Sequence, residues 1–356
     1  MFKKKTVLIL GAGASYEAGL PVGDMLKTQI ADGLRVRKTD EWYGSWAVAD
    51  KGLVEAIRSL DKSGHYKTGE IQDTCKRISS ALPLARSIDN YLHSHKDSKA
   101  IEKCGKVGIV GSILNAERES KLKVDDENGA SPKVDFPELA GTWYNRFASL
   151  MFEPTFDDLR HSLENLTVII FNYDRCFEHF MYHAIITYYG CYALDAANVV
   201  KSMKIYHPYG SAGYLPWMEQ KPAAKFGEVV DGGRLLSLAD QVKTYTEGVD
   251  RESSEIKAIH SAMRETNNVV FLGFGYIPLN MQLLRPPADG AEKHGKTRPE
   301  KFFLGTGYGI FPEDREIVSS RVAQMIPSEY GQVTIGDKET TCAGLFDRFG
   351  FTVSDL

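Results

Sequence analysis

Short apolar segments, each followed by glycine or polar residues, set the pattern of this chain. Five segments are rich in Val, Ile, Leu and Phe and show no polar alternation, which is typical of buried parallel strands. They span Thr6–Leu10, Leu166–Phe171, Met203–Tyr206, Asn268–Leu272 and Lys301–Leu304. Parallel strands of an open sheet bind ligands at their carboxyl ends, so the glycine and polar residues behind each segment should meet there. The pattern therefore predicts one cleft assembled from distant parts of the sequence.

The stretch between the first two segments carries a helical pattern instead. It is about 155 residues long, too long for a simple crossover. Apolar residues recur there at intervals of three and four, which predicts helices over Lys51–Leu60, Glu70–Leu82, Ser87–His93 and Ala100–Leu122. Ser87 and Asp89 both suit a helix start. Lys123–Pro137 is polar, contains glycine and proline, and is typical of a surface loop.

Together these elements predict an α/β protein with a Rossmann-like, doubly wound parallel sheet and a large helical insertion. We expect a single domain over residues 1–356, with the helical insert at about 36–160. A second stretch, at about 212–255, has an irregular pattern, most marked over Ala223–Asp250. It should cross over the cleft or lie at an edge of the sheet.

Composition narrows the class of protein. Hydrophobic residues make up 43% and charged residues 25% of the chain, and the net charge of −4 argues against a broad nucleic-acid-binding surface. No apolar run approaches the roughly 18 residues of a membrane helix. Met1–Lys5 leads directly into a strand without the features of a secretory signal, so we expect a cytoplasmic protein. None of the five cysteines forms a C-x-x-C pair, which disfavours disulfides and thiolate zinc sites.

The first strand ends in a glycine-rich turn that suits a phosphate group. Gly11, Ala12, Gly13, Ser15, Gly19 and Pro21 are the candidate binding residues of this turn. Glycines allow backbone N–H groups to approach a phosphate, and we expect a helix beginning near Tyr16 to favour its negative charge. The dinucleotide fingerprint G-x-G-x-x-G would need glycine at position 16, which disfavours a hydride-transferring dehydrogenase.

Two later strand ends carry the candidate catalytic residues. Asn172 and Asp174 follow the second strand, where they suit either a strand-end turn and helix cap or contact with a water and a ribose. His207 follows the third strand and is either a structural histidine or a general base. Gly273 and Gly275, and Thr306 between two further glycines, end the late strands, where tight turns and ligand contact are both open. His93 and His95 lack the spacing of a metal site, so no metal is expected.

In this order the motifs resemble the sirtuin-like (silent information regulator) family. That family opens with G-A-G-x-S-x-x-x-G-[IL]-P, here Gly11–Pro21, and has a strand ending in N-[IY]-D, here Asn172–Asp174. The element Ser87–Asp89 is similar to one in its bacterial branch. The resemblance implies NAD⁺ as the bound nucleotide. The paired cysteines of the deacylases' structural zinc are missing here, so it favours the bacterial branch, in which this fold hydrolyses NAD⁺ during antiviral defence.

One departure concerns the catalytic base. The family has a histidine directly before a glycine, whereas here Tyr209 precedes Gly210 and the nearest histidine is His207. A two-residue shift along an extended strand keeps a side chain on the same face. Whether His207 or Tyr209 takes the position of the base is open at this point.

The function implied by the resemblance is cleavage of NAD⁺ to ADP-ribose and nicotinamide by an anti-phage effector. Asn172 would orient the attacking water and His207 would accept a proton. Restraint of such an activity implies a homo-oligomer, a partner ATPase or helicase, or a phage-derived trigger. The alternatives are a non-catalytic NAD⁺ or ADP-ribose sensor, an NAD⁺-dependent deacylase and an ADP-ribosyltransferase.

Overall fold

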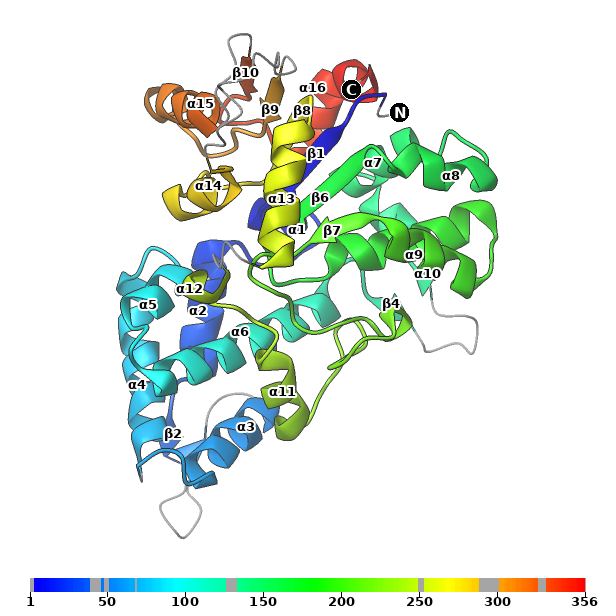
Figure 1. Cartoon of the computed structure of the whole chain (residues 1–356). Coiled ribbons are helices and arrows are strands. Elements are labelled where there is room, and N and C mark those ends of the chain that lie inside the picture. Colours follow the sequence, from blue (N-terminus) through cyan, green and yellow to red (C-terminus); the bar gives the residue numbers. More distant parts are fainter. Residues whose placement is uncertain are drawn as a thin grey trace.

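The computed structural model of the chain describes residues 3–38, 46–47, 51–67, 69–125, 133–248, 253–287, 301–325 and 331–355. Its centre is a sheet of six parallel strands in the order β10-β9-β8-β1-β6-β7 (Figure 1). The strands are β1 (Thr6–Leu10), β6 (Leu166–Ile170), β7 (Lys204–Tyr206), β8 (Asn268–Leu272), β9 (Phe302–Gly305) and β10 (Gln332–Ile335). Counted along the chain, this is the Rossmann order 3-2-1-4-5-6. The predicted fold class is confirmed.

The central strands are buried on both faces, which explains their uninterrupted apolar sequences. In β1, Val7 and Ile9 belong to one hydrophobic core, and Leu8 and Leu10 to a second one on the opposite face. Successive residues of a strand point to opposite faces of a sheet, so each face must be covered. β1 pairs with β6 on one side and β8 on the other, which places Leu10 beside Ile170 and Leu272 at the carboxyl ends.

Helices cover both faces of the sheet, as a doubly wound fold requires. The first core includes residues of α13 (Ser254–Glu265), α14 (Pro278–Leu284) and α15 (Pro312–Met325). The second includes residues of α7 (Trp143–Met151), α8 (Phe156–Leu163), α9 (Cys176–Tyr189), α10 (Ala193–Ser202) and α16 (Cys342–Asp355). Helices α7 and α8 come from the later part of the predicted insert, and they lie against the sheet.

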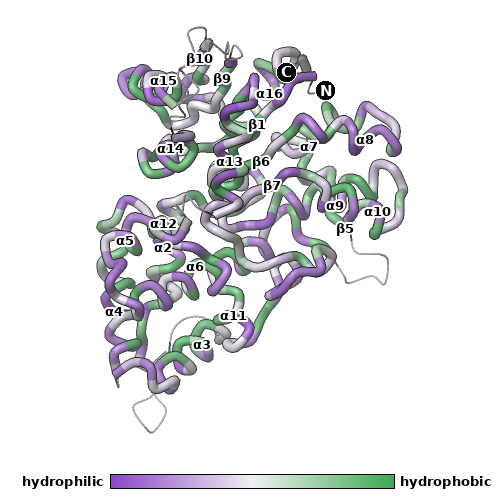
Figure 2. Tube along the Cα trace, in the orientation of Figure 1, coloured by the Kyte–Doolittle hydropathy of each residue, from purple (hydrophilic) through white to green (hydrophobic). Residues whose placement is uncertain are grey.

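The remaining helices of the insert, together with α2 (Gly23–Gly33), which precedes it, form a group beyond the carboxyl ends of the strands, which we call the helical lobe (Figure 1). It consists of α2, α3 (Lys51–Lys62), α4 (Glu70–Ala81), η1 (Leu82–Leu84), α5 (Ile88–Ser94) and α6 (Lys99–Glu119). The four predicted helices are confirmed to within three residues at each end. Hydrophilic and hydrophobic residues are interspersed along α3 and α4, as their amphipathic pattern requires (Figure 2). Helix α6 is instead buried on all sides over Cys104–Val110, because the other helices of the lobe surround it.

The stretch at about 212–255 is more regular than its sequence predicts. It contains η3 (Pro216–Met218), α11 (Gly232–Ala239) and α12 (Tyr245–Gly248), while residues 249–252 lie outside the described ranges. A Cβ atom at Gly232 would lie 2.5 Å from the backbone nitrogen of Ala56, so α11 packs directly on α3. The crossover thus adds a helix to the helical lobe, a tertiary contact that local sequence does not reveal.

Short two-stranded elements complete the fold. β2 (Arg37–Lys38) pairs with β3 (Trp46–Ala47). The predicted loop at Lys123–Pro137 contains β4 (Val124–Asp125), β5 (Lys133–Val134) and the start of η2 (Phe136–Leu139), and residues 126–132 fall outside the description. Within the described ranges, no helix has both the length and the apolar character needed to cross a bilayer.

Candidate functional site

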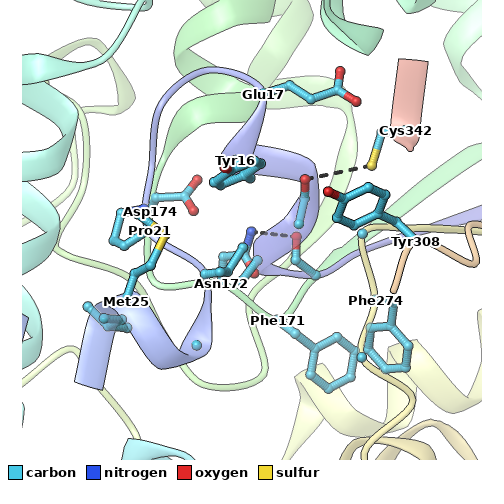
Figure 3. Close-up of a pocket in the computed structure, with 18 of the residues that line it drawn as sticks. Tyr16, Glu17, Pro21, Met25, Phe171, Asn172, Asp174, Phe274, Tyr308 and Cys342 are labelled. Atoms are coloured by element: carbon cyan, nitrogen blue, oxygen red, sulfur yellow. Dashed lines mark hydrogen bonds between the residues drawn. The ribbon is translucent and has the colours of Figure 1, made fainter. Parts of the chain in front are cut away.

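A cavity of about 940 Å³ lies at the carboxyl ends of the central strands (Figure 3). It is lined by the segments that follow β1, β6, β8 and β9, and by residues of α2 and α5 in the helical lobe. The order of strands reverses between β1 and β8, which is where open α/β sheets bind their ligands. Four of the five segments predicted to meet at one edge of the sheet therefore do so, while the segment after β7 is not part of the lining.

Most of the residues predicted from sequence come together in this cavity. Ten of the twelve line it: Gly11, Ala12, Gly13, Gly19, Pro21, Asn172, Asp174, Gly273, Gly275 and Thr306. Ser15 and His207 are the two that are not part of the lining. Ser15 is buried, at 3% exposure, because the chain coils immediately after Gly11 and turns its side chain inward.

The glycine-rich turn differs from the prediction in its helix and in its hydrogen bonds. Helix α1 spans Ala12–Tyr16, so it begins four residues before the predicted start and ends there instead. The N–H groups of Gly11 and Gly13 donate to the carbonyls of Leu272 and Gly273, at 2.9 and 3.0 Å. These two groups therefore join β1 to β8 and are not directed at a phosphate.

Close backbone packing explains the glycines at positions 11, 13 and 273. A Cβ atom at Gly11 would lie 2.5 Å from the Gly273 carbonyl oxygen, and one at Gly13 would lie 2.7 Å from the Gly273 Cα. Gly273 itself has φ of +56°, a conformation that side chains disfavour. The turn after β1 and the end of β8 are thus pressed together at the base of the cavity.

We expect Gly11→Ala to lower the free energy of unfolding by about 2–3 kcal/mol, because the added methyl group forces the two backbones apart. Gly275→Ala is the matched control, since its Cβ would meet nothing nearer than an Ile277 side-chain atom at 3.6 Å. We expect it to change stability by less than about 1 kcal/mol. Urea denaturation followed by circular dichroism measures both. Equal losses would show that close packing does not explain Gly11.

Asn172 links the segment after β6 to the glycine-rich turn through its side-chain amide. Its Nδ2 donates to the Gly11 carbonyl oxygen at 3.0 Å and to Ser15 Oγ at 3.1 Å. Both amide hydrogens are used in this way, and the side-chain oxygen Oδ1 is the acceptor left for a ligand. Asn172 lines the cavity at 7% exposure. The amide is thus held rigidly by the glycine-rich turn.

Asp174 lies beside Asn172 at the start of α9. Its Oδ1 accepts a hydrogen bond from the Cys176 N–H at 3.1 Å. Burial raises the pKa of Asp174, while hydrogen bonds from Cys176 and Ser15 partly oppose that shift. Ser15 therefore touches both Asn172 and Asp174 from behind the cavity wall, and its predicted contact with the nucleotide is replaced by a supporting one.

His207 lies outside the lining because β7 ends one residue before it. The chain turns there: the Gly210 N–H donates to the His207 carbonyl at 2.8 Å, and Gly210 has φ of +69°. The expectation that an extended strand keeps His207 on the same face as the residue before Gly210 is therefore wrong. Tyr209 is also absent from the lining, and its hydroxyl donates to Asn280 Oδ1 at 2.7 Å. Asn280 does line the cavity.

His207 forms a buried pair with Glu178. Its Nε2 lies 2.6 Å from Glu178 Oε1, and its Nδ1 is buried with no partner among the described residues. Burial alone lowers the pKa of His207, but Glu178 outweighs it, with help from Asp174 and Glu255, so the net pKa is raised above 6.5. The pairing with Glu178 therefore favours the charged form of His207.

This pair predicts a pH-dependent contribution to stability. A histidine whose pKa is raised by folding stabilises fully below its unfolded pKa of about 6.5, and the effect fades as pH rises through the folded value. We expect the stability difference between wild type and His207→Gln to be larger at pH 6 than at pH 9. Urea denaturation at several pH values measures it. A difference that grows with pH would contradict the ion pair.

Several residues of the site were not predicted from the sequence. Glu17 accepts hydrogen bonds from the N–H groups of Trp143 at 2.7 Å and Ala343 at 2.8 Å, so one carboxylate caps α7 and α16 beside the cavity. Tyr16 and Tyr308 are exposed aromatic residues of the lining. Among the described residues that line the cavity, Lys121 is the one lysine or arginine.

Asp89 also lines the cavity. The sequence indicated a capping role for it and a place in the Ser87–Asp89 element of the resemblance, without a contact to a ligand. Ser87 is the cap of α5, accepting from the Asn90 N–H at 3.1 Å. Asp89 lies two residues further along, in the first turn of α5, and accepts a hydrogen bond from the Tyr173 hydroxyl, which connects the helical lobe to the loop after β6. Burial raises the pKa of Asp89, and this hydrogen bond opposes the shift.

No known protein family has a model that matches this sequence, and no curated protein matches it. In the described part of the chain, no three His, Cys, Asp or Glu side chains converge as metal ligands. The geometry of the cavity, together with the motifs of the sequence, therefore carries the functional interpretation.

Proposed function

We propose that the chain is a sirtuin-like enzyme that hydrolyses NAD⁺ to ADP-ribose and nicotinamide. The observation that carries the proposal is the pair of hydrogen bonds from Asn172 to Gly11 and Ser15. They join the two motifs of the resemblance, which are 157 or more residues apart, within one cavity at the switch point of a Rossmann sheet. The cavity volume also falls within the range of cofactor sites.

The charges of the lining suggest how NAD⁺ would lie. Asp89, Tyr173 and Asp174 surround one end of the cavity, where acidic groups suit the cationic nicotinamide. Thr306 and Tyr308 follow β9 at the other side of the β1 turn, where the tyrosine ring offers a stacking surface for adenine. The diphosphate would then cross the turn after β1, within reach of Lys121.

The proposed reaction requires little proton transfer by the protein. Nicotinamide leaves as a neutral molecule from a cationic ring, so no acid is needed, and the sugar develops positive charge as in glycoside hydrolysis. Asn172 Oδ1 would orient the attacking water by accepting one of its hydrogens. Asp174, whose pKa is raised, would take the proton that the water releases. His207 would not contact the substrate and would act indirectly, through its pairing with Glu178.

A second function is favoured by the position of His207. Since neither His207 nor Tyr209 lines the cavity, a sensor that binds NAD⁺ or ADP-ribose without cleaving it is the alternative. Incubating the purified chain with NAD⁺ and quantifying nicotinamide distinguishes the two. The hydrolase releases nicotinamide and ADP-ribose in equal amounts, whereas the sensor binds NAD⁺ saturably and leaves it intact. Failure to bind NAD⁺ would contradict both.

The biological setting belongs to the same proposal and rests on the resemblance. It comprises a cytoplasmic anti-phage role, a homo-oligomer, and control by a partner ATPase or helicase or by a phage-derived trigger. NAD⁺ loss is harmful to any cell, so restraint of this activity until infection follows from the proposed reaction.

A further inference from the structure

The helical lobe contributes an acidic residue to the cavity that the motifs of the sequence do not assign. Asp89 lies in the first turn of α5, is half-buried and forms part of the cavity wall. The lobe and the sheet share one hydrophobic core, and Asp89 lies on the lobe side of the cavity that they enclose (Figure 1). The helical lobe therefore supplies a carboxylate to the side of the cavity that faces the glycine-rich turn.

The surroundings of Asp89 fix where its carboxylate lies. One oxygen accepts the hydrogen bond from Tyr173, and Tyr173 stands between the lining residues Asn172 and Asp174. The carboxylate thus sits next to the residues proposed to face the reacting sugar.

The other lining carboxylates have partners from the backbone. Glu17 accepts hydrogen bonds from backbone N–H groups at the start of two helices, and Asp174 accepts one from the Cys176 N–H. Asp89 accepts hydrogen bonds from the Tyr173 phenol and from its own backbone N–H, which hold the side chain in place, and it forms no ion pair with a lysine or arginine of the described residues. A fixed carboxylate in a partly enclosed cavity attracts a cation more strongly than one in water.

We propose that Asp89 is a specificity-determining residue that selects the oxidised, cationic nicotinamide riboside end of NAD⁺. This inference rests on the proposed function. The carboxylate contacts the positively charged ring and its ribose, so it distinguishes NAD⁺ from NADH, whose nicotinamide is neutral. The same charge favours the positive sugar that forms as the bond to nicotinamide breaks.

The test compares three ligands that differ at the nicotinamide riboside end, which is cationic in the first, neutral in the second and missing from the third. Calorimetry measures binding of carba-NAD⁺, in which a methylene replaces the ring oxygen of the nicotinamide ribose and prevents cleavage, and of NADH and AMP. We expect Asp89→Asn to weaken carba-NAD⁺ binding about ten-fold or more, since a bond to a charged group is lost. NADH and AMP, which lack the cation, should bind within about two-fold of wild type.

Tyr173→Phe is the matched control, which tests whether Asp89 has only a structural role. It removes the hydrogen bond between lobe and sheet but keeps the carboxylate, so the preference for carba-NAD⁺ over NADH should persist. The inference is overturned if Asp89→Asn weakens all three ligands alike, if it weakens none, or if Tyr173→Phe abolishes the preference. If wild type binds AMP and NADH but shows no preference for carba-NAD⁺, the inference fails while nucleotide binding stands. If wild type binds none of them, the proposed function itself fails.

Discussion

Asn172→Ala is expected to reduce the rate of NAD⁺ cleavage about a hundred-fold or more, because the water it orients loses its position relative to the sugar. The amide lies on the cavity wall with both hydrogens fixed by Gly11 and Ser15, so its oxygen is held at a defined place. Alanine removes this oxygen and cannot replace it. The measurement is nicotinamide release under saturating NAD⁺, which reports the catalytic rate rather than binding.

Ser15→Ala separates the catalytic effect from a structural one. It removes one of the two acceptors that hold the Asn172 amide but leaves the amide itself, so we expect a loss of about ten-fold or less. Thermal melting of both variants checks the fold. Equal losses in the two variants would mean that Asn172 only supports the glycine-rich turn, and wild-type turnover by Asn172→Ala would remove it from the mechanism.

Glu117→Ala is expected to lower the free energy of unfolding by about 3–5 kcal/mol, because it leaves a buried arginine without its counter-ion. Glu117 and Arg175 are 0% and 1% exposed. Arg175 Nε donates to Glu117 Oε1 at 3.0 Å, and its Nη1 donates to the Ala224 carbonyl at 2.7 Å. The Gly227 N–H donates to the same carboxylate at 3.0 Å. One ion pair therefore joins α6, the crossover and the residue that follows Asp174.

Asp347→Ala is the matched control for this prediction. Asp347 pairs with Arg146 at 2.6 Å, but the two side chains are 56% and 30% exposed, so water replaces the lost partner. We expect a change of less than about 1 kcal/mol. Urea denaturation of the three proteins gives the comparison. A loss in Glu117→Ala no larger than in Asp347→Ala would show that the buried pair does not fix the crossover.

The sequence predicts the sheet and the lobe well because both depend on local periodicity. Uninterrupted apolar runs such as Thr6–Leu10 and Asn268–Leu272 become the central strands, and the spacing in Glu70–Leu82 becomes α4. β10 (Gln332–Ile335) was missed because an edge strand is exposed on part of its length, so its four residues alternate apolar and polar types. Helix α11 was missed because its packing on α3 depends on residues far away in the chain.

The site was predictable where a motif supplies several residues at once. The glycine-rich turn and Asn172–Asp174 lie where their strand ends place them. Position alone did not reveal Glu17, since its partners Trp143 and Ala343 are 126 and 326 residues away. Nor did it reveal the contact of Asp89 with Tyr173, which lies 84 residues away in the chain. The expectation that His207 faces the cavity was wrong because the chain turns directly after Tyr206, where the strand was correctly predicted to end, and Gly210 adopts a φ of +69°.

The most direct test of this account is a crystal structure of the chain with ADP-ribose bound. It should show the diphosphate over the turn formed by Gly11–Gly13, the adenine beside Tyr308, and the anomeric carbon of the terminal ribose facing Asn172 Oδ1. ADP-ribose bound outside this cavity, or bound within it with the terminal ribose turned away from Asn172, would contradict the account.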